Sequence, residues 1–325
     1  NAIPTGLRAG GLFAGAGTLV LTNSQGRAGI QWGGFRNRLF SGTILDRCGL
    51  GDATRADQWR YTGYAAAFER ASLTLPDGIG WYLGFGQDGH AILPMRLGGL
   101  DGAGRFEVVE ANLNNWTSPR LGCDDGRTHD FAGYLQITRN GGGYGQLVKV
   151  GSNVQRMSGA TNELQTSARV VDGTLVLGSL TALDSQTLLA RGFHNNVYVG
   201  GAETTAGMAP RFLVDCGNVT VTNVVKVLGC ADAGVSPGVG AQAGAVTFAE
   251  LVVSNDCTLV AEAGATARFA KITQLDGPHA FGRRGAGTVT LADDFTVGGS
   301  LDLAWDGGLF VVEGVLTVAD GTKLS

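Results

Sequence analysis

The sequence predicts an all-β fold: a right-handed parallel β-helix, or solenoid, with loop insertions in its first half. Short runs rich in Val, Leu and Thr follow one another along the 325 residues, and Gly, Asn or Asp separates them about every 8 to 12 residues. Gly is abundant, with 54 residues against only 7 Pro, as expected for many tight turns. One phrase also recurs, since GTLVL stands at 17–21 and again at 173–177. A repeated phrase favours a solenoid because each coil is the same structural unit and requires a similar pattern of residues.

The strand-like segments are expected to form the coils of this solenoid. A sandwich or a barrel also consists of short strands, but neither ordinarily needs so long an unbroken pattern of strand and turn. In each coil Val, Leu, Ile and Phe should point inward, while Gly, Asn and Asp serve the corners, where positive φ is needed. Within RVVDGTLVLGS at 169–179 we therefore expect Leu175 and Leu177 inside and Gly173 at a corner. The clearest strand segments are 18–22, 105–111, 134–139, 145–151, 195–201, 211–227, 245–255, 257–275 and 287–305.

Helical periodicity is nearly absent from the sequence. The best helix candidate is YAAAFERASL at 64–73, which would make about two to three turns at most. A poorer candidate is ATNELQTSARVV at 160–171. Any helix is therefore expected to be a short addition to a β fold.

The predicted organisation is one continuous solenoid with an irregular first part. Residues 1–130 are predicted to be an irregular start of the β-helix with Trp-rich insertions, and residues 131–325 to be regular coils. The chain starts without Met and ends directly after a strand-like segment, so we expect an excised piece of a longer precursor. The tryptophans of the first part could bind a ligand such as a sugar or pack the insertions against the coils. They are Trp32, Trp59, Trp81 and Trp116.

Composition and charge narrow the classes of partner. The net charge is −4, the pI is about 5.6 and 16% of the residues are charged, so no basic groove for nucleic acid is expected. No run of 18 apolar residues occurs, so no membrane-spanning helix is predicted. The five cysteines contain no C-x-x-C pair, and neither a metal site nor a cofactor is predicted. Cys216 and Cys230 could form a disulfide or remain buried thiols, and their spacing leaves both open.

The densest group of ionisable residues lies in GCDDGRTHD at 122–130. Its members are Asp124, Asp125, Arg127, His129 and Asp130. Carboxylates near a histidine could pair an acid with a base in glycan cleavage, or bind a divalent cation through their oxygens. Asp-Asp-Gly is also ordinary turn chemistry, and a polar corner is the interpretation that we favour. The same interpretation applies to Asp293 and Asp294 in LADDF, and motifs such as H-E-x-x-H and G-x-S-x-G do not occur.

The recurring phrase resembles the autotransporter-associated β-strand repeat, a family of passenger regions in Gram-negative autotransporters and related surface proteins. The family unit begins approximately G-x-G-T-L-x-L and continues with further phrases of the same kind. The successive phrases in this chain are GAGTLVL (15–21) and FSGTI (40–44), FAGYLQI (131–137) and DGTLVLG (172–178), and GAGTVTL (285–291) and FTVGGSLDL (295–303) with EGVLTV (313–318). Nothing in 45–130 matches. The resemblance implies a parallel β-helix, export and a surface location, and it implies no catalytic residue.

Two classes of function are therefore open. The leading hypothesis is a non-enzymatic scaffold of the autotransporter-passenger type, at the surface of a Gram-negative bacterium or secreted from it. It would act in adhesion, as a stalk or in self-assembly, with glycans, a host surface or neighbouring copies of itself as partners. The alternative is a β-helix protein that binds or cleaves polysaccharides, with the Trp-rich first part as a sugar platform. Its site would consist of Asp124, Asp125, Arg127 and His129.

Overall fold

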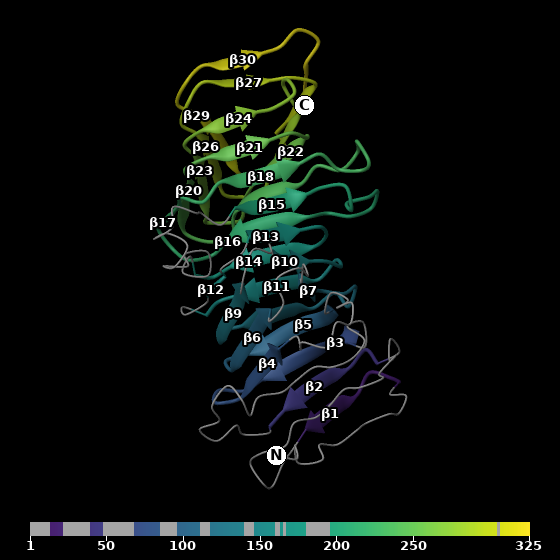
Figure 1. The fold of residues 1–325 in the computed structure, drawn as a ribbon. Coiled ribbons are helices and arrows are strands. Elements are labelled where there is room, and N and C mark those ends of the chain that lie inside the picture. The colour runs from purple at the N-terminus through teal and green to yellow at the C-terminus, as the bar shows by residue number, and fades with distance from the viewer. Residues whose placement is uncertain are drawn as a thin grey trace. The chain divides into compact units, whose positions relative to one another are not determined.

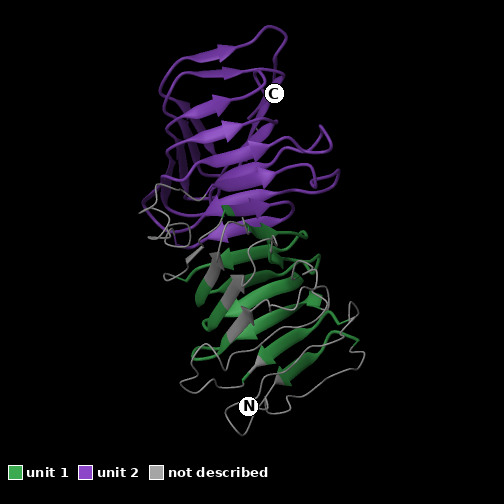
Figure 2. Ribbon diagram, viewed as in Figure 1, with its two compact units in different colours: residues 1–167, 181–188 green, residues 168–180, 189–325 purple. Residues whose placement is uncertain are grey.

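The chain is an all-β parallel solenoid, as the sequence predicts. Every regular element in the described part of the computed structural model is a β-strand, and the strands pair in parallel. The chain divides into two compact units, which Figure 2 colours separately. Unit 1 comprises residues 1–167 and 181–188, and unit 2 comprises residues 168–180 and 189–325. The structure describes residues 14–21, 40–47, 68–84, 96–110, 118–139, 146–159, 163–164, 167–179, 196–303 and 306–325.

Unit 1 stacks its strands in two ladders (Figure 1). The first ladder runs through β1 (Thr18–Leu21), β2 (Thr43–Asp46), β3 (Phe68–Leu75) and β5 (Arg96–Gly102). The ladder then divides, because β5 pairs with both β7 (Arg120–Leu121) and β8 (Thr128–Phe131). In the next coil β10 (Gln146–Lys149) pairs with β7, and β11 (Val154–Met157) pairs with β8. The second ladder consists of β4 (Gly80–Gly84), β6 (Arg105–Glu110), β9 (Tyr134–Arg139) and β12 (Glu163–Leu164).

Unit 2 stacks its strands more regularly (Figure 1). One ladder consists of β13 (Ser167–Val170), β15 (Val197–Gly200), β18 (Val225–Leu228), β21 (Leu251–Val253) and β24 (Ile272–Gln274). A second consists of β14 (Thr174–Leu177), β16 (Arg211–Val214), β19 (Gly238–Ala241), β22 (Cys257–Ala261), β25 (Phe281–Arg284), β28 (Ser300–Asp302) and β31 (Lys323–Leu324). A third consists of β17 (Val219–Val221), β20 (Ala245–Phe248), β23 (Thr266–Phe269), β26 (Thr288–Leu291) and β29 (Leu309–Val312), and β27 (Phe295–Val297) pairs with β30 (Leu316–Val318).

The core of unit 2 is a set of apolar side chains stacked in register. Leu175 is paired with Phe212, Phe212 with Val239, and Val239 with Leu259, and all four are fully buried. Each inward side chain therefore covers the one in the next coil, and the buried apolar area grows with every coil. In the third ladder Phe248 stacks on Phe269 in the same way, with ring centroids 5.0 Å apart. We call the four residues of the first set the apolar line.

The predicted positions in 169–179 are confirmed. Leu175 and Leu177 are both buried, and Gly173 has a φ of 65°, which a residue with a side chain rarely adopts. The predictions of two short helices are wrong. Residues 68–73 belong to β3, and the described part of 160–171 forms β12 and β13. Pairing of β3 on both edges, with β2 and with β5, outweighs the helix propensity of its Ala, Glu and Arg.

Corner residues connect neighbouring coils through side-chain oxygens. Asp172 Oδ1 accepts a hydrogen bond from Ala209 N at 2.9 Å, and Asn218 Oδ1 accepts one from Ala245 N at 3.2 Å. Similar bonds reach Ala280 N from Asp256 and Val315 N from Asp294. Corner backbone groups lack a ladder partner, so these side chains satisfy them. The predicted corner role of Asp294 is thus confirmed.

One corner of unit 2 carries loops of unequal length. Residues 201–210 connect β15 to β16, residues 229–237 connect β18 to β19, and residues 254–256 connect β21 to β22. The first two loops bond to each other, since Ala231 N donates to Thr204 O at 3.0 Å. The strands that follow these loops nevertheless pair without a shift of register.

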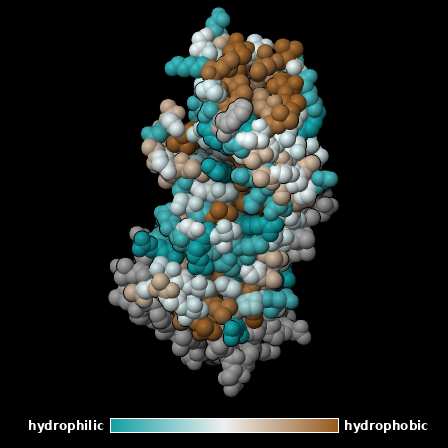
Figure 3. All heavy atoms as spheres, turned by 180° about the vertical axis from the view of Figure 1, so that it is seen from behind, coloured by the Kyte–Doolittle hydropathy of each residue, from teal (hydrophilic) through white to brown (hydrophobic). Residues whose placement is uncertain are grey.

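The last coil of unit 2 exposes apolar side chains at one edge of its ladders. β29, β30 and β31 each pair with one described strand only. Figure 3 shows the apolar surface gathered at this end of the unit. The residues exposed there are Leu309, Val315, Leu316, Val318 and Leu324. Separately, the described residues contain no apolar helix of the length that a bilayer crossing requires.

Candidate functional site

The ionisable residues predicted from the sequence lie where unit 1 interrupts its strand pairing. β5 pairs with β7 at Leu97 and Leu121, and with β8 at Gly102 and Phe131. Residues 122–127, which join β7 to β8, leave the ladder between these two points. Backbone groups of β5 in this interval therefore lack a ladder partner in the adjacent coil.

Two amide side chains from the following coil supply those missing partners. Asn153 Nδ2 donates to Gly98 O at 2.8 Å. Gln155 Oε1 accepts from Leu100 N at 2.9 Å, and Gln155 Nε2 donates to Leu100 O at 2.8 Å. Both side chains are buried, and a buried backbone group without a partner costs about 1 to 3 kcal/mol. The two amides thus act as a substitute strand edge inside the coil.

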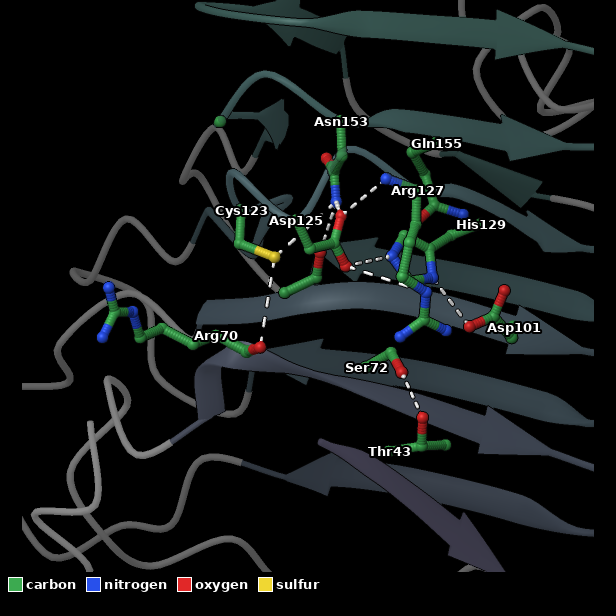
Figure 4. Close-up of polar contacts among 12 residues, drawn as sticks. Thr43, Arg70, Ser72, Asp101, Cys123, Asp125, Arg127, His129, Asn153 and Gln155 are labelled. Carbon is green, nitrogen blue, oxygen red and sulfur yellow. Dashed lines mark hydrogen bonds and ion pairs between the residues drawn. The ribbon is translucent and has the colours of Figure 1, made fainter. Parts of the chain in front are cut away.

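The centre of the site is His129, whose imidazole lies between two carboxylates (Figure 4). His129 Nδ1 is 2.8 Å from Asp101 Oδ2, and His129 Nε2 is 3.0 Å from Asp125 Oδ2. An ionised carboxylate only accepts hydrogen bonds, so both ring nitrogens must donate. The geometry therefore calls for the charged imidazolium, with 0% of its side chain exposed. We refer to Asp101, Asp125, His129, Asn153 and Gln155 as the His129 cluster.

A glycine makes room for this imidazole. Gly99 on β5 lies directly against the ring of His129, and a Cβ at this position would overlap ring atoms. The second carboxylate is held in place as well, because Asp125 Oδ1 accepts from Arg127 N at 3.0 Å and from Asn153 Nδ2 at 3.2 Å. Asp101 Oδ1 accepts from Asp130 N at 3.0 Å. Backbone and side-chain donors thus fix both carboxylates around the ring.

The electrostatics of the cluster follow from these contacts. Burial alone would lower the pKa of His129, but the hydrogen bonds and negative charges of Asp101 and Asp125 outweigh it and raise that pKa above its ordinary value of 6.5. Burial alone would raise the pKa of Asp125, but hydrogen bonds from Arg127 N, His129 and Asn153 hold it below its ordinary value of 3.8. The charged forms of both groups are favoured together.

The nearby thiol of Cys123 is not suited to act as a nucleophile. Burial, together with the negative charge of Asp125, raises the pKa of Cys123 to about 11. A thiol with so high a pKa stays protonated near neutral pH, and the thiolate is the reactive form. Cys123 instead lies within the network, since Asn153 Nδ2 is 3.8 Å from its sulfur. The amide orientation of Asn153 is fixed by its acceptors, and its buried Oδ1 has no hydrogen-bond partner among the described residues.

The structure brings together only part of the predicted site. Asp125 and His129 are in contact, but Asp124 is exposed and accepts from Ser152 N at 2.8 Å, as a corner residue does. Arg127 is exposed, with its Nε 4.0 Å from Asp125. Asp130 points outward to Arg156 and Ser158. Within the part that the structure describes, no group of His, Cys, Asp and Glu has the arrangement of a metal site.

The cluster also contains residues that the sequence analysis missed. Asp101, Gly99, Asn153 and Gln155 come from neighbouring coils, and Asp101 stands 28 positions before His129. Coil stacking alone brings them together. The signal that would have found them is the coil period itself, which sets Gln155 in register with His129.

Other predicted residues have different outcomes. Cys216 and Cys230 are both thiols, so the disulfide considered from the sequence is not formed. Trp81 lies in β4, but its side chain is outside the described residues. Trp32, Trp59 and Trp116 also lie outside them. The sugar-binding hypothesis for these tryptophans therefore stays a prediction, as does the boundary near residue 130.

Chemically, the His129 cluster is closed. Both imidazole nitrogens are occupied by carboxylates, so neither is available to a substrate as acid or base. The arrangement suits a structural role, in which a buried charge is paired and fully hydrogen-bonded. Comparisons of the chain with protein-family models, with curated proteins and with solved structures found no match.

Proposed function

We propose that this chain is a non-enzymatic β-solenoid scaffold of the autotransporter-passenger type. It works at the surface of a Gram-negative bacterium or after secretion, in adhesion, as a stalk or in self-assembly. The observation that carries the proposal is the use of the candidate catalytic groups for structure. The one histidine of the ionisable group is fully buried and bonded through both nitrogens to Asp101 and Asp125, and Asp124 serves a corner.

In self-assembly, a coil of one copy would add to the strand ladders of another. β29 and β30 present backbone groups on the side away from β26 and β27, next to exposed Leu309, Leu316 and Val318. A further parallel coil would pair with these groups and cover the apolar side chains, as each coil of the unit covers the one before it. In the proposal, neighbouring copies are the partners in self-assembly, and glycans or a host surface are the partners in adhesion.

The first experiment separates the scaffold from the glycan-cleaving alternative. The purified chain is incubated with a panel of neutral and acidic polysaccharides, and new reducing ends and unsaturated uronates are measured. We expect no release of product by the wild type. Release by the wild type that is lost in Asp125→Ala, but kept in the corner control Asp293→Ala, would establish the enzyme and refute the scaffold.

The second experiment tests the location. Antibodies raised against the purified chain are applied to intact cells of the source bacterium and to its culture medium. Labelling of intact cells, or recovery of the chain from the medium, supports the proposal. Labelling that appears only after the cells are permeabilised contradicts it, and a periplasmic protein labelled in parallel shows that the cells were intact.

A further inference from the structure

We propose that His129 is a pH-sensitive staple, which holds residues 122–127 against β5 while its imidazole is charged and releases them when it loses a proton. The staple consists of two hydrogen bonds of the imidazole, which we call its legs. One runs to Asp101 on β5 at 2.8 Å, and the other runs to Asp125 in the joining segment at 3.0 Å. Because Gly99 leaves space for the ring only, the imidazole cannot move aside without leaving the coil.

The loss of one proton must break one leg. A neutral imidazole carries one N–H, so it can donate to one carboxylate and must turn a lone pair towards the other. That arrangement sets two acceptors about 3 Å apart in a buried site, where an unpaired polar group is most costly. Asp101 stays bound to a strand amide, Asp130 N on β8. Asp125 lies outside the strand ladder, and its other oxygen is bound by Arg127 N of the same segment and by the Asn153 side chain. The leg to Asp125 is therefore the one that opens.

The polar and charged groups that face the ring or the joining segment come from four elements. Asp101 faces it from β5, Asp125 faces it from the joining segment, and Arg127 lies beside Asp125. Cys123 shares the segment and keeps its proton, because its pKa is raised to about 11. From β10, Lys149 directs its Nζ to Val150 O at 2.7 Å and to Gly151 O at 2.6 Å. β11 contributes the uncharged Gln155, so His129 is the group of this cluster whose charge is lost as the pH rises through its raised pKa.

The direction of the pH effect follows from the two pKa shifts. The pKa of His129 is raised in the folded chain, so its stabilisation is complete below 6.5 and is lost as the pH rises through the raised value. The pKa of Asp125 is lowered, so its stabilisation is present above 3.8 and is lost as the pH falls through the lowered value. The closed state occupies the window between these limits, and the alkaline limit belongs to His129.

Hydrogen–deuterium exchange of the whole chain from about pH 6 to about pH 9 tests the staple, after correction for the intrinsic exchange rate. Protection of the amides of Gly122 and Arg127, which bond to Leu97 O and to Asp125, should fall about tenfold for each unit by which the pKa of His129 exceeds its ordinary value, whereas Asp130 N stays bound to Asp101 and should keep its protection. The internal control is Ala245 N, which is capped by the uncharged Asn218 and should keep its protection. Unchanged protection of the Gly122 and Arg127 amides across this range would overturn the proposal.

Two variants assign the step to one residue. His129→Gln removes the titration, so the pH step should vanish, whereas His279→Gln in unit 2 should leave the step intact. A step that persists in His129→Gln overturns the proposal. If His129→Gln does not fold, nuclear magnetic resonance of a variant without the other three histidines reports His129 directly. There, a titration midpoint above 6.5 supports the staple, and a midpoint at or below 6.5 overturns it.

Discussion

Unit 1 and unit 2 each consist of parallel strand ladders, but different kinds of side chain fill the interior of their coils. In unit 2 the apolar line that begins at Leu175 passes through four coils before a charge appears in it, at Arg283. The side chain of Arg283 forms an ion pair with Asp306 and donates a hydrogen bond to Gly285 O. In unit 1 the buried positions on β8 and β11 include the polar His129 and Gln155 beside the apolar Phe131 and Met157, and the buried Asn153 directly precedes β11.

The difference teaches that a polar core follows from an interruption of strand pairing. Where strands pair without a break, backbone groups satisfy one another and apolar side chains can fill the coil. Where residues 122–127 leave the ladder, the backbone of β5 needs other partners, and Asn153 and Gln155 supply them. Polar side chains bring further polar partners with them, which is why the buried cluster includes a charged triad.

The largest loss of stability is expected from removing apolar contact in unit 2. Phe248→Ala should lower the free energy of unfolding by about 3 to 5 kcal/mol, because Phe248 is fully buried and stacks on Phe269. Urea denaturation measures the loss. The matched control is Thr247→Ala on the same strand, whose side chain points out and should cost far less. Equal losses in both variants would contradict the assignment of Phe248 to the core.

Removing a charge from unit 1 should have the next largest effect. Asp125→Asn keeps the shape of the side chain but removes the ionic leg to His129, and we expect a loss of about 1.5 to 3 kcal/mol near pH 6. Asp294→Asn is the control in unit 2, where a corner needs only an acceptor, as Asn218 shows. We expect a change of less than about 0.5 kcal/mol for that control. A comparable loss in the two variants would show that the two kinds of aspartate do not differ.

A smaller effect is expected from filling the space beside the imidazole. Gly99→Ala places a methyl group against the ring of His129 and should cost about 1 to 3 kcal/mol. Gly17→Ala is the control in the same unit, since a Cβ there meets no atom within 4 Å. Thermal unfolding of both variants is the measurement. A neutral Gly99→Ala would mean that the ring can shift, which the closed cluster does not allow.

The smallest effect is expected from surface charge. Arg268→Ala removes an ion pair with Glu313 whose atoms lie 2.6 Å apart but remain exposed to solvent. We expect a loss of about 0.2 to 1 kcal/mol, decreasing as salt is added. Urea denaturation at low and high salt tests this. A larger, salt-independent loss would place this pair with the buried charges of unit 1 instead.

The sequence predicts the strands well because their cause is local. Alternation and turn residues locate β9 at 134–139 without error, and they locate the inward positions Leu175 and Leu177. The helix prediction at 64–73 fails because the strand that forms there depends on partners far away in the sequence. β3 is a strand since β2 and β5 lie on either side of it, and partners in other coils leave no mark in a ten-residue window.

For the site as well, the sequence predicts the local features but not the contacts between coils. The group at 122–130 marks the right place, and Asp124 behaves as the polar corner that the sequence favours. What the sequence did not provide is the partner of His129 in another coil, because Asp101 lies 28 positions away. Burial of His129 is a property of the stack, and only a known coil period would have revealed it.

The unequal loops at 201–210, 229–237 and 254–256 have a consequence for how such a chain can be altered. Because Phe212 and Val239 stay in register across loops of different length, this corner separates loop length from strand register. Evolution can therefore lengthen or replace a loop here without rebuilding the core. For protein engineering, the corner offers graft positions at which foreign peptides could be displayed in a row, one per coil.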